Sequence, residues 1–418
     1  MKRIFAILLL AAMCLNLLAC SAGGEKPGSI SATDLLCDLP AGTVGHPEEL
    51  TPGTSGLPGF AVRLLQHSAA EGKNTLVSPL SVMYALAMTA NGAKGETLRQ
   101  MEAVLGMPVS QLNAYLYSYA KALEGAEGKL KLANSIWFTD DERFTVERPF
   151  LQTVKDHYDA SVYRVPFDDI TCRDINSWVK EKTDGMIPQI LDEIPEAAVM
   201  YLVNALAFEA KWQETYERGD VRDAVFTLED GTTREIELMD STESLYLETG
   251  SATGFIKPYA GGDYAFAALL PNDCTVAELV ASLEGTQLNH LLRNPTQTTV
   301  LAAIPKFETE YSTEMSEVLK EMGMPDAFDS HKADLSGLGH STHGNLFINR
   351  VLHKTFISVG EQGTKAGAAT VVEVNDECAI AYPKETKTVF LDRPFVYMLM
   401  DTETCAPIFI GTMMDPQQ

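Results

Sequence analysis

The sequence predicts an α+β protein whose folded part is one large domain. Helical and extended segments follow one another without the regular strand–helix alternation of a doubly wound sheet, so sheets with helices packed around them fit better. No internal repeat with a period of about 20 to 50 residues is visible. After residue 58 no further stretch has linker composition, which assigns residues 59–418 to the domain. Because this exceeds the usual size of about 50 to 250 residues, we expect large sheets.

Residues 1–19 have the features of an export signal. Lys2 and Arg3 precede an apolar run from Ile4 to Leu18, which is shorter than the stretch of about 20 apolar residues that spans a bilayer. The run ends in Leu17-Leu18-Ala19-Cys20, which resembles the lipobox of bacterial lipoproteins. This resemblance implies cleavage before Cys20 and a lipid on its sulfur. We expect a protein anchored on the extracellular side of the cell membrane; ordinary cleavage and secretion is the alternative.

Residues 20–58 are rich in Gly, Pro, Ser and Thr, which predicts a flexible tether. Beyond it, apolar periodicity predicts the elements of the domain in order. The Ser78-Pro79 pair is typical of a helix start. Helices are expected over residues 60–72, 78–93 and 172–182, strands over 130–138 and 200–209, and alternating extended runs over 226–238 and 388–397.

Charge and cysteine content exclude several functions. The net charge of -25, from 32 basic and 57 acidic residues, argues against nucleic acid as a partner. The seven cysteines, at positions 14, 20, 37, 172, 274, 378 and 405, form no CxxC pair and have no histidine at metal-ligand spacing. We expect no metal, no cofactor and no dense disulfide framework.

The common catalytic signatures are missing from the sequence. It contains no G-x-S-x-G, HExxH, GxxxxGK[ST] or GxGxxG motif, and Gly339–Gly344 has the wrong spacing for a nucleophile turn. We therefore do not expect an enzyme, although a surface hydrolase with an unrecognised site stays open as an alternative.

The segment Glu361–Lys387 carries the most information about function. If residues 364–374 form a strand, Lys365 and Glu373 fall on one face. The other face is uncharged, and it consists of Thr364, Ala366, Ala368, Thr370, Val372 and Val374. Such a strand suits burial in a sheet, yet its first half is too small to be anchored there by its own burial. An exposed linker or a fixed edge strand fits the same residues.

Several motifs of this sequence resemble motifs of the serpin family, and they occur in the same order as in the family over residues 60–415. The run Glu361-x-Gly363-Thr364-x-Ala366-x-Ala368-Ala369-Thr370 resembles the hinge of the serpin reactive-centre loop. Further matches are Asn74 to Ser81, Leu132 to Trp137, Ile175 to Ile187, Leu202 to Phe208 with Lys211-Trp212, Ile304 to Phe307, Ala333 to Gly337, Asp392 to Phe395, and Pro407-x-Phe409-x-Gly411.

The resemblance implies a serpin fold, with large mixed sheets, surrounding helices and an exposed C-terminal loop. It also implies a suicide inhibitor of serine proteases, with cysteine proteases as a further target class. The protease attacks one bond of the loop and forms an acyl-enzyme, and the freed loop then enters a large β-sheet. The expected partner is a serine protease, and the inhibitor is expected to be a monomer.

The resemblance also assigns positions to control of the sheet. Ser78, Ser81, Asn204 and His353 would form a polar cluster that controls opening, and Trp212, Lys306 and Glu361 would lie where the loop enters. Without the family, the same residues also fit two helix caps, a core histidine and a surface ion pair.

Counting along the loop as in inhibitory relatives places the attacked bond between Glu377 and Cys378. A glutamate-preferring protease would suit this bond, and an elastase-like one would suit cleavage after Cys378 or Ala379; the target itself, of host or bacterial origin, stays open. The hinge departs from the family pattern at Lys365, usually Glu, and at Gly367, usually Ala. Gly367 would slow insertion through its entropy. A non-inhibitory serpin that acts as a binding lipoprotein is the alternative, but Thr364 and Ala366 carry no charge that would favour it.

Overall fold

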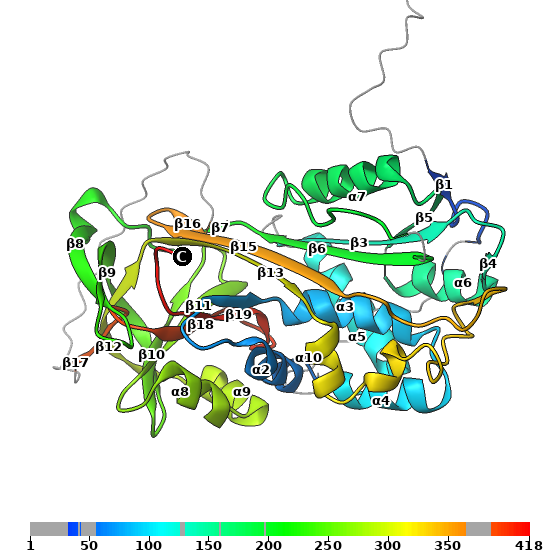
Figure 1. Cartoon of the computed structure of the whole chain (residues 1–418). Helices are drawn as coiled ribbons and strands as arrows, with labels where there is room; N and C mark the ends of the chain where they lie inside the picture. The colour runs from blue at the N-terminus through cyan, green and yellow to red at the C-terminus, as the bar shows by residue number, and fades with distance from the viewer. Residues whose placement is uncertain are drawn as a thin grey trace, which may run out of the picture. The chain divides into compact units, whose positions relative to one another are not determined.

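The structure, a computed structural model, describes residues 32–40, 42, 56–125, 130–158, 160–195, 198–364 and 386–418. All of them belong to the unit Ala32–Gln418. Helices and strands are mixed without a βαβ repeat, as the sequence predicts (Figure 1).

Most described strands belong to three sheets. A four-stranded sheet has the order β1 (Thr33–Asp34), β5 (Ser161–Val165), β3 (Leu130–Thr139), β6 (Met200–Phe208). A second four-stranded sheet has the order β13 (Phe307–Glu314), β15 (Leu352–Gly360), β16 (Gly363–Thr364), β7 (Ala210–Lys211). A nine-stranded sheet runs β17 (Thr386–Phe390), β12 (Thr296–Pro305), β9 (Thr233–Glu248), β10 (Ala252–Pro258), β11 (Tyr264–Pro271), β18 (Phe395–Asp401), β19 (Pro407–Met413), β2 (Thr75–Val77), with β8 (Val221–Thr227) on β9. The short strands β4 (Phe144–Val146) and β14 (Gly339–Ser341) pair with each other.

The helices lie around these sheets. They are α2 (Leu57–Ser68), α3 (Pro79–Ala90), α4 (Gly95–Leu105), α5 (Val109–Gly125), α6 (Arg148–His157), α7 (Asp169–Lys182), α8 (Val276–Ser282), α9 (Gly285–Arg293) and α10 (Ser316–Glu321), with 3-10 turns at Arg218–Asp220 and Pro325–Phe328. Within the described residues, no helix is long and apolar enough to cross a membrane.

Local sequence explains where the central helices begin. The hydroxyl of Ser78 accepts a hydrogen bond from the Ser81 N–H, and Pro79 occupies the first helical position of α3. Asp168 caps α7 through the N–H groups of Ile170 and Thr171.

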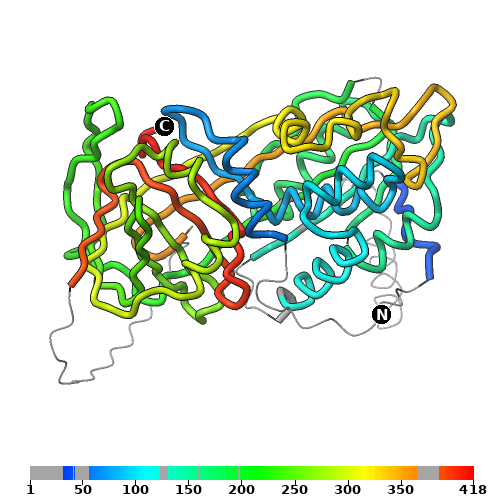
Figure 2. The backbone as a smooth tube through the Cα atoms, turned by 90° about the horizontal axis from the view of Figure 1, so that it is seen from below, coloured from blue at the N-terminus to red at the C-terminus, as the bar shows by residue number. Residues whose placement is uncertain are grey.

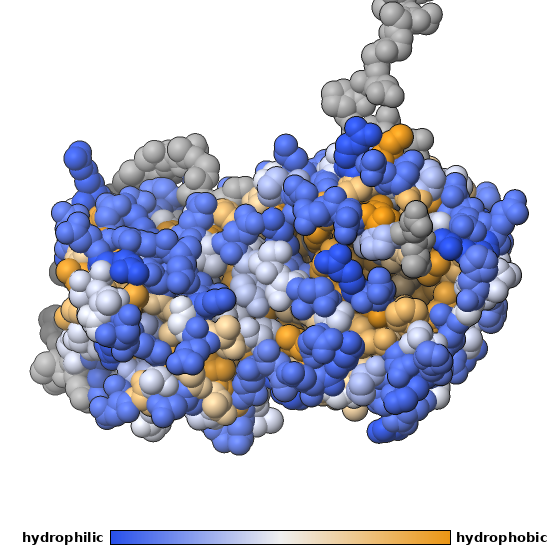
Figure 3. All heavy atoms as spheres, viewed as in Figure 1, coloured by the Kyte–Doolittle hydropathy of each residue, from blue (hydrophilic) through white to orange (hydrophobic). Residues whose placement is uncertain are grey.

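The core forms where apolar strands meet the helices. Every residue of β11 and of β19 is buried, because these strands are covered on both faces. Figure 2 shows β19 beside α2, with which it packs. The face in Figure 3 is mostly hydrophilic, as the acidic composition requires, and apolar surface gathers between α7 and α4.

Part of the predicted tether differs from the sequence prediction. Within residues 20–58, Thr33 and Asp34 pair with Arg164 and Tyr163 of β5. Leu39 is buried, and Lys155 donates to the carbonyls of Leu36 and Leu39. A short apolar and turn-forming stretch therefore packs on the domain, and helix α2 begins at Leu57, two residues before the expected boundary.

Two predicted extended runs are each interrupted and form parts of two strands. The run 226–238 contains a turn between β8 and β9, where Gly231 has a φ of 82°. The run 388–397 is divided between β17 and β18 by the segment that contains Pro394. In both places a glycine or a proline lies in the turn or loop that interrupts the strand, although the alternating pattern of the sequence continues through it.

Candidate functional site

The four predicted cluster residues meet between α3, β6 and β15. Ser78 N–H donates to His353 Nε2 at 3.1 Å, and Ser81 Oγ donates to Asn204 Oδ1. The Ser78 hydroxyl also donates to the Ile408 carbonyl of β19 at 2.9 Å. The cap of α3 thereby connects the helix to β15 and to the nine-stranded sheet.

His353 is held neutral by its surroundings. It is 5% exposed, and burial lowers its pKa from 6.5 to about 4. Its Nε2 accepts the Ser78 N–H, so the proton of the neutral ring is carried by Nδ1. Protonation of Nε2 would replace this hydrogen bond by repulsion between the Nε2–H of His353 and the backbone N–H of Ser78.

The first hinge residues lie inside a sheet. Gly363 and Thr364 form β16, which pairs antiparallel with β15 on one side and with β7 on the other. Gly363 has a φ of 151°, and a Cβ at this position would come within 2.1 Å of the Ala210 carbonyl oxygen. Thr364 is buried, and its hydroxyl shares a hydrogen bond of 2.5 Å with the hydroxyl of Tyr259.

Trp212 fixes the turn that leads into the hinge. Its Nε1 donates to the Gly360 carbonyl at 2.8 Å, and its N–H donates to the Gln362 carbonyl at 3.0 Å. Its ring stacks on Tyr259 with centroids 4.5 Å apart. The turn between β15 and β16 is therefore held by both the backbone and the aromatic ring of Trp212.

Lys306 and Glu361 form an ion pair at the same turn. The Nζ–Oε1 distance is 2.5 Å, and Lys306 also contacts Glu237 at 3.2 Å. The hydrogen bond from Lys306 lowers the pKa of Glu361. The Glu361 side chain is 42% exposed, so water screens the pair.

We expect Glu361→Gln to lower the free energy of unfolding by less than about 1 kcal/mol. Because the pKa of Glu361 is lowered in the folded state, its contribution is present above the unfolded value of about 4.3 and is lost as the pH falls. Thermal unfolding at low salt and at high salt measures the effect, which salt should weaken. The exposed Glu308→Gln on β13 is the matched control; a loss of several kcal/mol from Glu361→Gln alone would contradict this estimate.

Two pockets lie next to β6 and residues 344–353. The described residues show no hydrogen-bonded ladder between β6 and β15. A small pocket of about 30 Å³ lies there beside Ser81, Asn204 and His353. A larger one of about 340 Å³ follows between Met200–Leu202 and residues 344–350.

The remaining predicted residues lie outside the described part of the chain. These are Cys20, the hinge residues Ala366, Gly367, Ala368, Ala369 and Thr370, and the expected reactive bond Glu377–Cys378. Within the described ranges, no group of three or more His, Cys, Asp or Glu residues could hold a metal ion.

Sequence reasoning missed several residues of the site. Asn204 Nδ2 donates to Asn134 Oδ1, which extends the cluster to β3. Asn134 stands in one of the quoted motifs, so its polarity in an apolar strand was an available signal. Tyr259 directly follows β10 and Glu237 lies in β9, and nothing in their local sequence indicates contact with the hinge or with Lys306.

Comparison with known proteins decides the family. The family model described as "Serpin (serine protease inhibitor)" matches residues 56–416. The chain belongs to the serpin family. It is 31% identical to the leukocyte elastase inhibitor of Bos taurus over 376 residues, which cover 84% of this chain and 95% of the relative.

Solved structures agree with this serpin assignment. The thermophilic serpin tengpin in its native state is 44% identical, covers 92% of this chain and 100% of its own, and has a TM-score of 0.85. Tengpin in its latent state, also 44% identical, covers 86% of this chain and 96% of its own, with a TM-score of 0.76. The predicted serpin fold is confirmed. Because the family model describes inhibitors, the prediction that the chain is not an enzyme is also confirmed.

Proposed function

We propose that this serpin traps a serine protease by inserting its cleaved reactive-centre loop between β6 and β15. One observation carries the proposal. The short strand β16, where the hinge begins, is already paired between β15 and β7, whereas in the described residues no ladder joins β6 to the rest of β15. The greater similarity to native than to latent tengpin supports a starting state in which the loop has not entered fully.

The pairing of β16 supports a specific register for the proposed insertion. Val359 pairs with Thr364 on one side, and Ala210 pairs with Thr364 on the other. Continued without a bulge, these ladders would set Thr370 opposite His353 and opposite Asn204. The loop would thus separate the cluster as its sixth residue beyond Thr364 entered.

The same register agrees with the faces of the segment. Along β15 the residues His353, Thr355, Ile357 and Val359 are buried and alternate with partly exposed ones. Directly paired residues share a face, so Thr364, Ala366, Ala368 and Thr370 would enter the buried side. Lys365 would remain on the solvent side.

Insertion offers enough free energy to disable a protease. Roughly ten new strand residues at about 0.5 to 1.5 kcal/mol net per hydrogen bond give on the order of 10 kcal/mol. A typical domain has a stability of only about 5 to 15 kcal/mol. Loss of one oxyanion-hole donor slows acyl chemistry by roughly a hundred- to a thousandfold, so a deformed protease would remain as the acyl-enzyme.

The target class follows from the expected bond. The similarity to a leukocyte elastase inhibitor supports an elastase-like protease that cuts after Cys378 or Ala379. Cleavage between Glu377 and Cys378 by a glutamate-preferring protease is the other expectation, and both positions lie outside the described residues.

A protease panel tests the function. Incubation of the intact serpin with elastase-like and glutamate-preferring proteases is expected to give a covalent adduct that survives SDS, together with a released C-terminal peptide. Mass spectrometry of that peptide identifies the cleaved bond. Cleavage by every protease without an adduct would contradict inhibition and leave a binding function, and turnover of a substrate without consumption of the serpin would indicate a hydrolase.

We further propose that the protein is exported and anchored through a lipid on Cys20. The apolar run between Arg3 and Cys20 supports this proposal. Expression of the full chain in a bacterial host is expected to place it in the membrane fraction, and Cys20→Ala is expected to release it. An unchanged distribution of Cys20→Ala would contradict the lipid anchor.

A further inference from the structure

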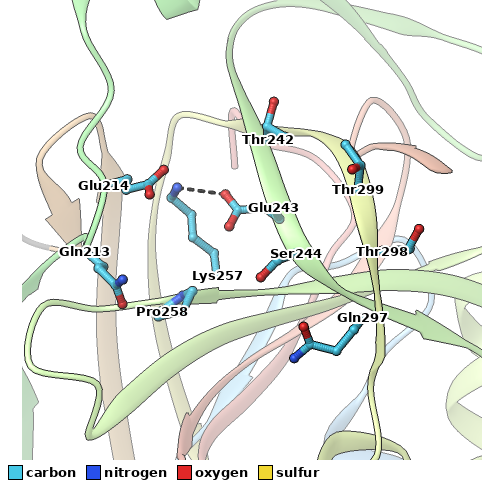
Figure 4. Close-up of a pocket in the computed structure, with 10 residues that line it drawn as sticks. All are labelled: Gln213, Glu214, Thr242, Glu243, Ser244, Lys257, Pro258, Gln297, Thr298 and Thr299. Carbon is cyan, nitrogen blue, oxygen red and sulfur yellow. Dashed lines mark hydrogen bonds and ion pairs between the residues drawn. The ribbon is translucent and has the colours of Figure 1, made fainter. Parts of the chain in front are cut away.

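A polar pocket of about 300 Å³ lies near the hinge, where β9, β10 and β12 meet (Figure 4). Glu243 of β9 and Lys257 of β10 line it with only 8% and 3% of their side chains exposed. Lys257 Nζ and Glu243 Oε1 are 2.8 Å apart, and the ammonium also lies over the rings of Tyr216 and Trp212. The pocket therefore contains a buried ion pair that the loop mechanism does not use.

The carboxylate of Glu243 is only half satisfied. Its Oε1 accepts from Lys257 Nζ at 2.8 Å and from Ser241 Oγ at 2.7 Å, whereas no described residue donates to Oε2. In Figure 4 this second oxygen faces the open space beside Lys257 and Ser244. Oε2 is not among the buried side-chain atoms that lack a partner in the described residues, so it is accessible to solvent in the pocket and can accept from a bound donor.

A β-bulge adjoins the pocket. The pairing of β12 with β9 shifts register between Gln297 and Val300, and Val300 then pairs with Glu243. Bulges interrupt pairing and re-aim side chains, and they are frequent next to binding sites. Because of the bulge, Thr298 and Thr299 do not stand in the ladder with β9, and both line the pocket next to Gln297, which pairs with Leu245.

The charge of the pocket favours a cation. Its charged lining residues are Glu214, Glu243 and Lys257, which leaves one net negative charge. An adjoining pocket shares Glu214 and Lys257 and adds Asp220 and Asp240 against Arg222. The other polar lining residues are neutral hydroxyls and amides: Gln213, Thr242, Ser244, Gln297, Thr298 and Thr299.

We propose that this pocket binds a small primary amine that carries hydroxyl groups. The ammonium donates to Glu243 Oε2 and neutralises the excess negative charge, and the hydroxyls exchange hydrogen bonds with the neutral polar wall. An anion would meet Glu243 and Glu214, while Lys257 is already paired. A metal ion is disfavoured because no group of three or more ligating side chains occurs in the described residues.

Ligand-observed NMR titration of the purified serpin tests this proposal with three sugars of similar shape. Glucosamine carries the ammonium, glucose lacks it, and N-acetylglucosamine keeps the nitrogen without the charge. We expect glucosamine to bind at least about fivefold more tightly than the other two, because charge-assisted hydrogen bonds are roughly twice as strong as neutral ones. Equal binding of all three sugars, or no binding, would overturn the proposal.

Variants locate the binding. Glu214→Gln at the exposed rim is expected to weaken glucosamine binding a few-fold, and Gln297→Glu is expected to strengthen it, since each changes the pocket by one charge. The double variant Glu243→Gln with Lys257→Met removes the site without leaving an unpaired buried charge. Glu142→Gln, on an exposed residue outside the pocket, is the control. Glu214→Gln and Gln297→Glu test the proposal even if the double variant does not fold. If neither of them changes the affinity for glucosamine, the proposal is refuted.

Discussion

Replacing Gly363 with alanine is expected to slow loop insertion by about 30- to 150-fold. A Cβ there would lie 2.1 Å from the Ala210 carbonyl oxygen and 2.7 Å from the Lys211 Cα, and the φ of 151° disfavours any residue with a side chain. The variant can relieve this clash only by leaving the sheet. Insertion then has to restore a pairing that costs about 2 to 3 kcal/mol. Hydrolysis would win the competition, and the measurable result is a larger number of inhibitor molecules consumed per protease inactivated.

Gly360 provides the matched control. It pairs with Gly363 in the same ladder, yet a Cβ at this position meets nothing within 4 Å. Gly360→Ala should therefore inhibit like the natural protein. If Gly363→Ala inhibits with unchanged stoichiometry, β16 is not the start of the insertion path.

Acidification should destabilise this serpin through His353. Its pKa of about 4 in the folded state lies below the ordinary value of 6.5, so the unfolded chain binds the proton more tightly. The contribution of neutral His353 to the free energy of unfolding is fully present above pH 6.5 and is lost as the pH decreases toward 4. The total loss is about 3 kcal/mol, because one pKa unit corresponds to about 1.4 kcal/mol. Chemical denaturation between these pH values measures it.

Comparison of two glutamine variants isolates this contribution from the titration of carboxylates. His353→Gln removes the buried imidazole and should flatten the pH dependence in this range, whereas His331→Gln changes a side chain that is 93% exposed and should leave it as it is. An unchanged slope in His353→Gln would show that the lowered pKa of His353 does not govern acid stability.

Only the start of the predicted hinge, through Thr364, lies in the described residues. The period of two in residues 364–374 separates charged from uncharged positions, and the buried side chain of Thr364 agrees with that assignment. The cluster, in contrast, could be found only through the family motifs. Ser78 and His353 are 275 residues apart, and no local pattern distinguishes them from a cap and a core histidine.

Other features depend on contacts that periodicity does not contain. Residues 33–39 have tether composition but acquire partners on β5 and α6. Lys257 and Glu243 are charged residues that the sequence alone would place on a solvent face, yet both are buried, and Lys257 lies over the rings of Trp212 and Tyr216. Tertiary packing overrides the local pattern in both cases.

The stored free energy of the uninserted loop is the central claim, and the melting temperature before and after loop cleavage tests it most directly. A single cut within residues 365–385, by a protease that is then removed, should raise the melting temperature by about 20 °C, because on the order of 10 kcal/mol is released on insertion. Equal melting temperatures for the intact and the cut protein would mean that β6 and β15 do not accept the loop, and that this serpin is not an inhibitor of the inserting kind.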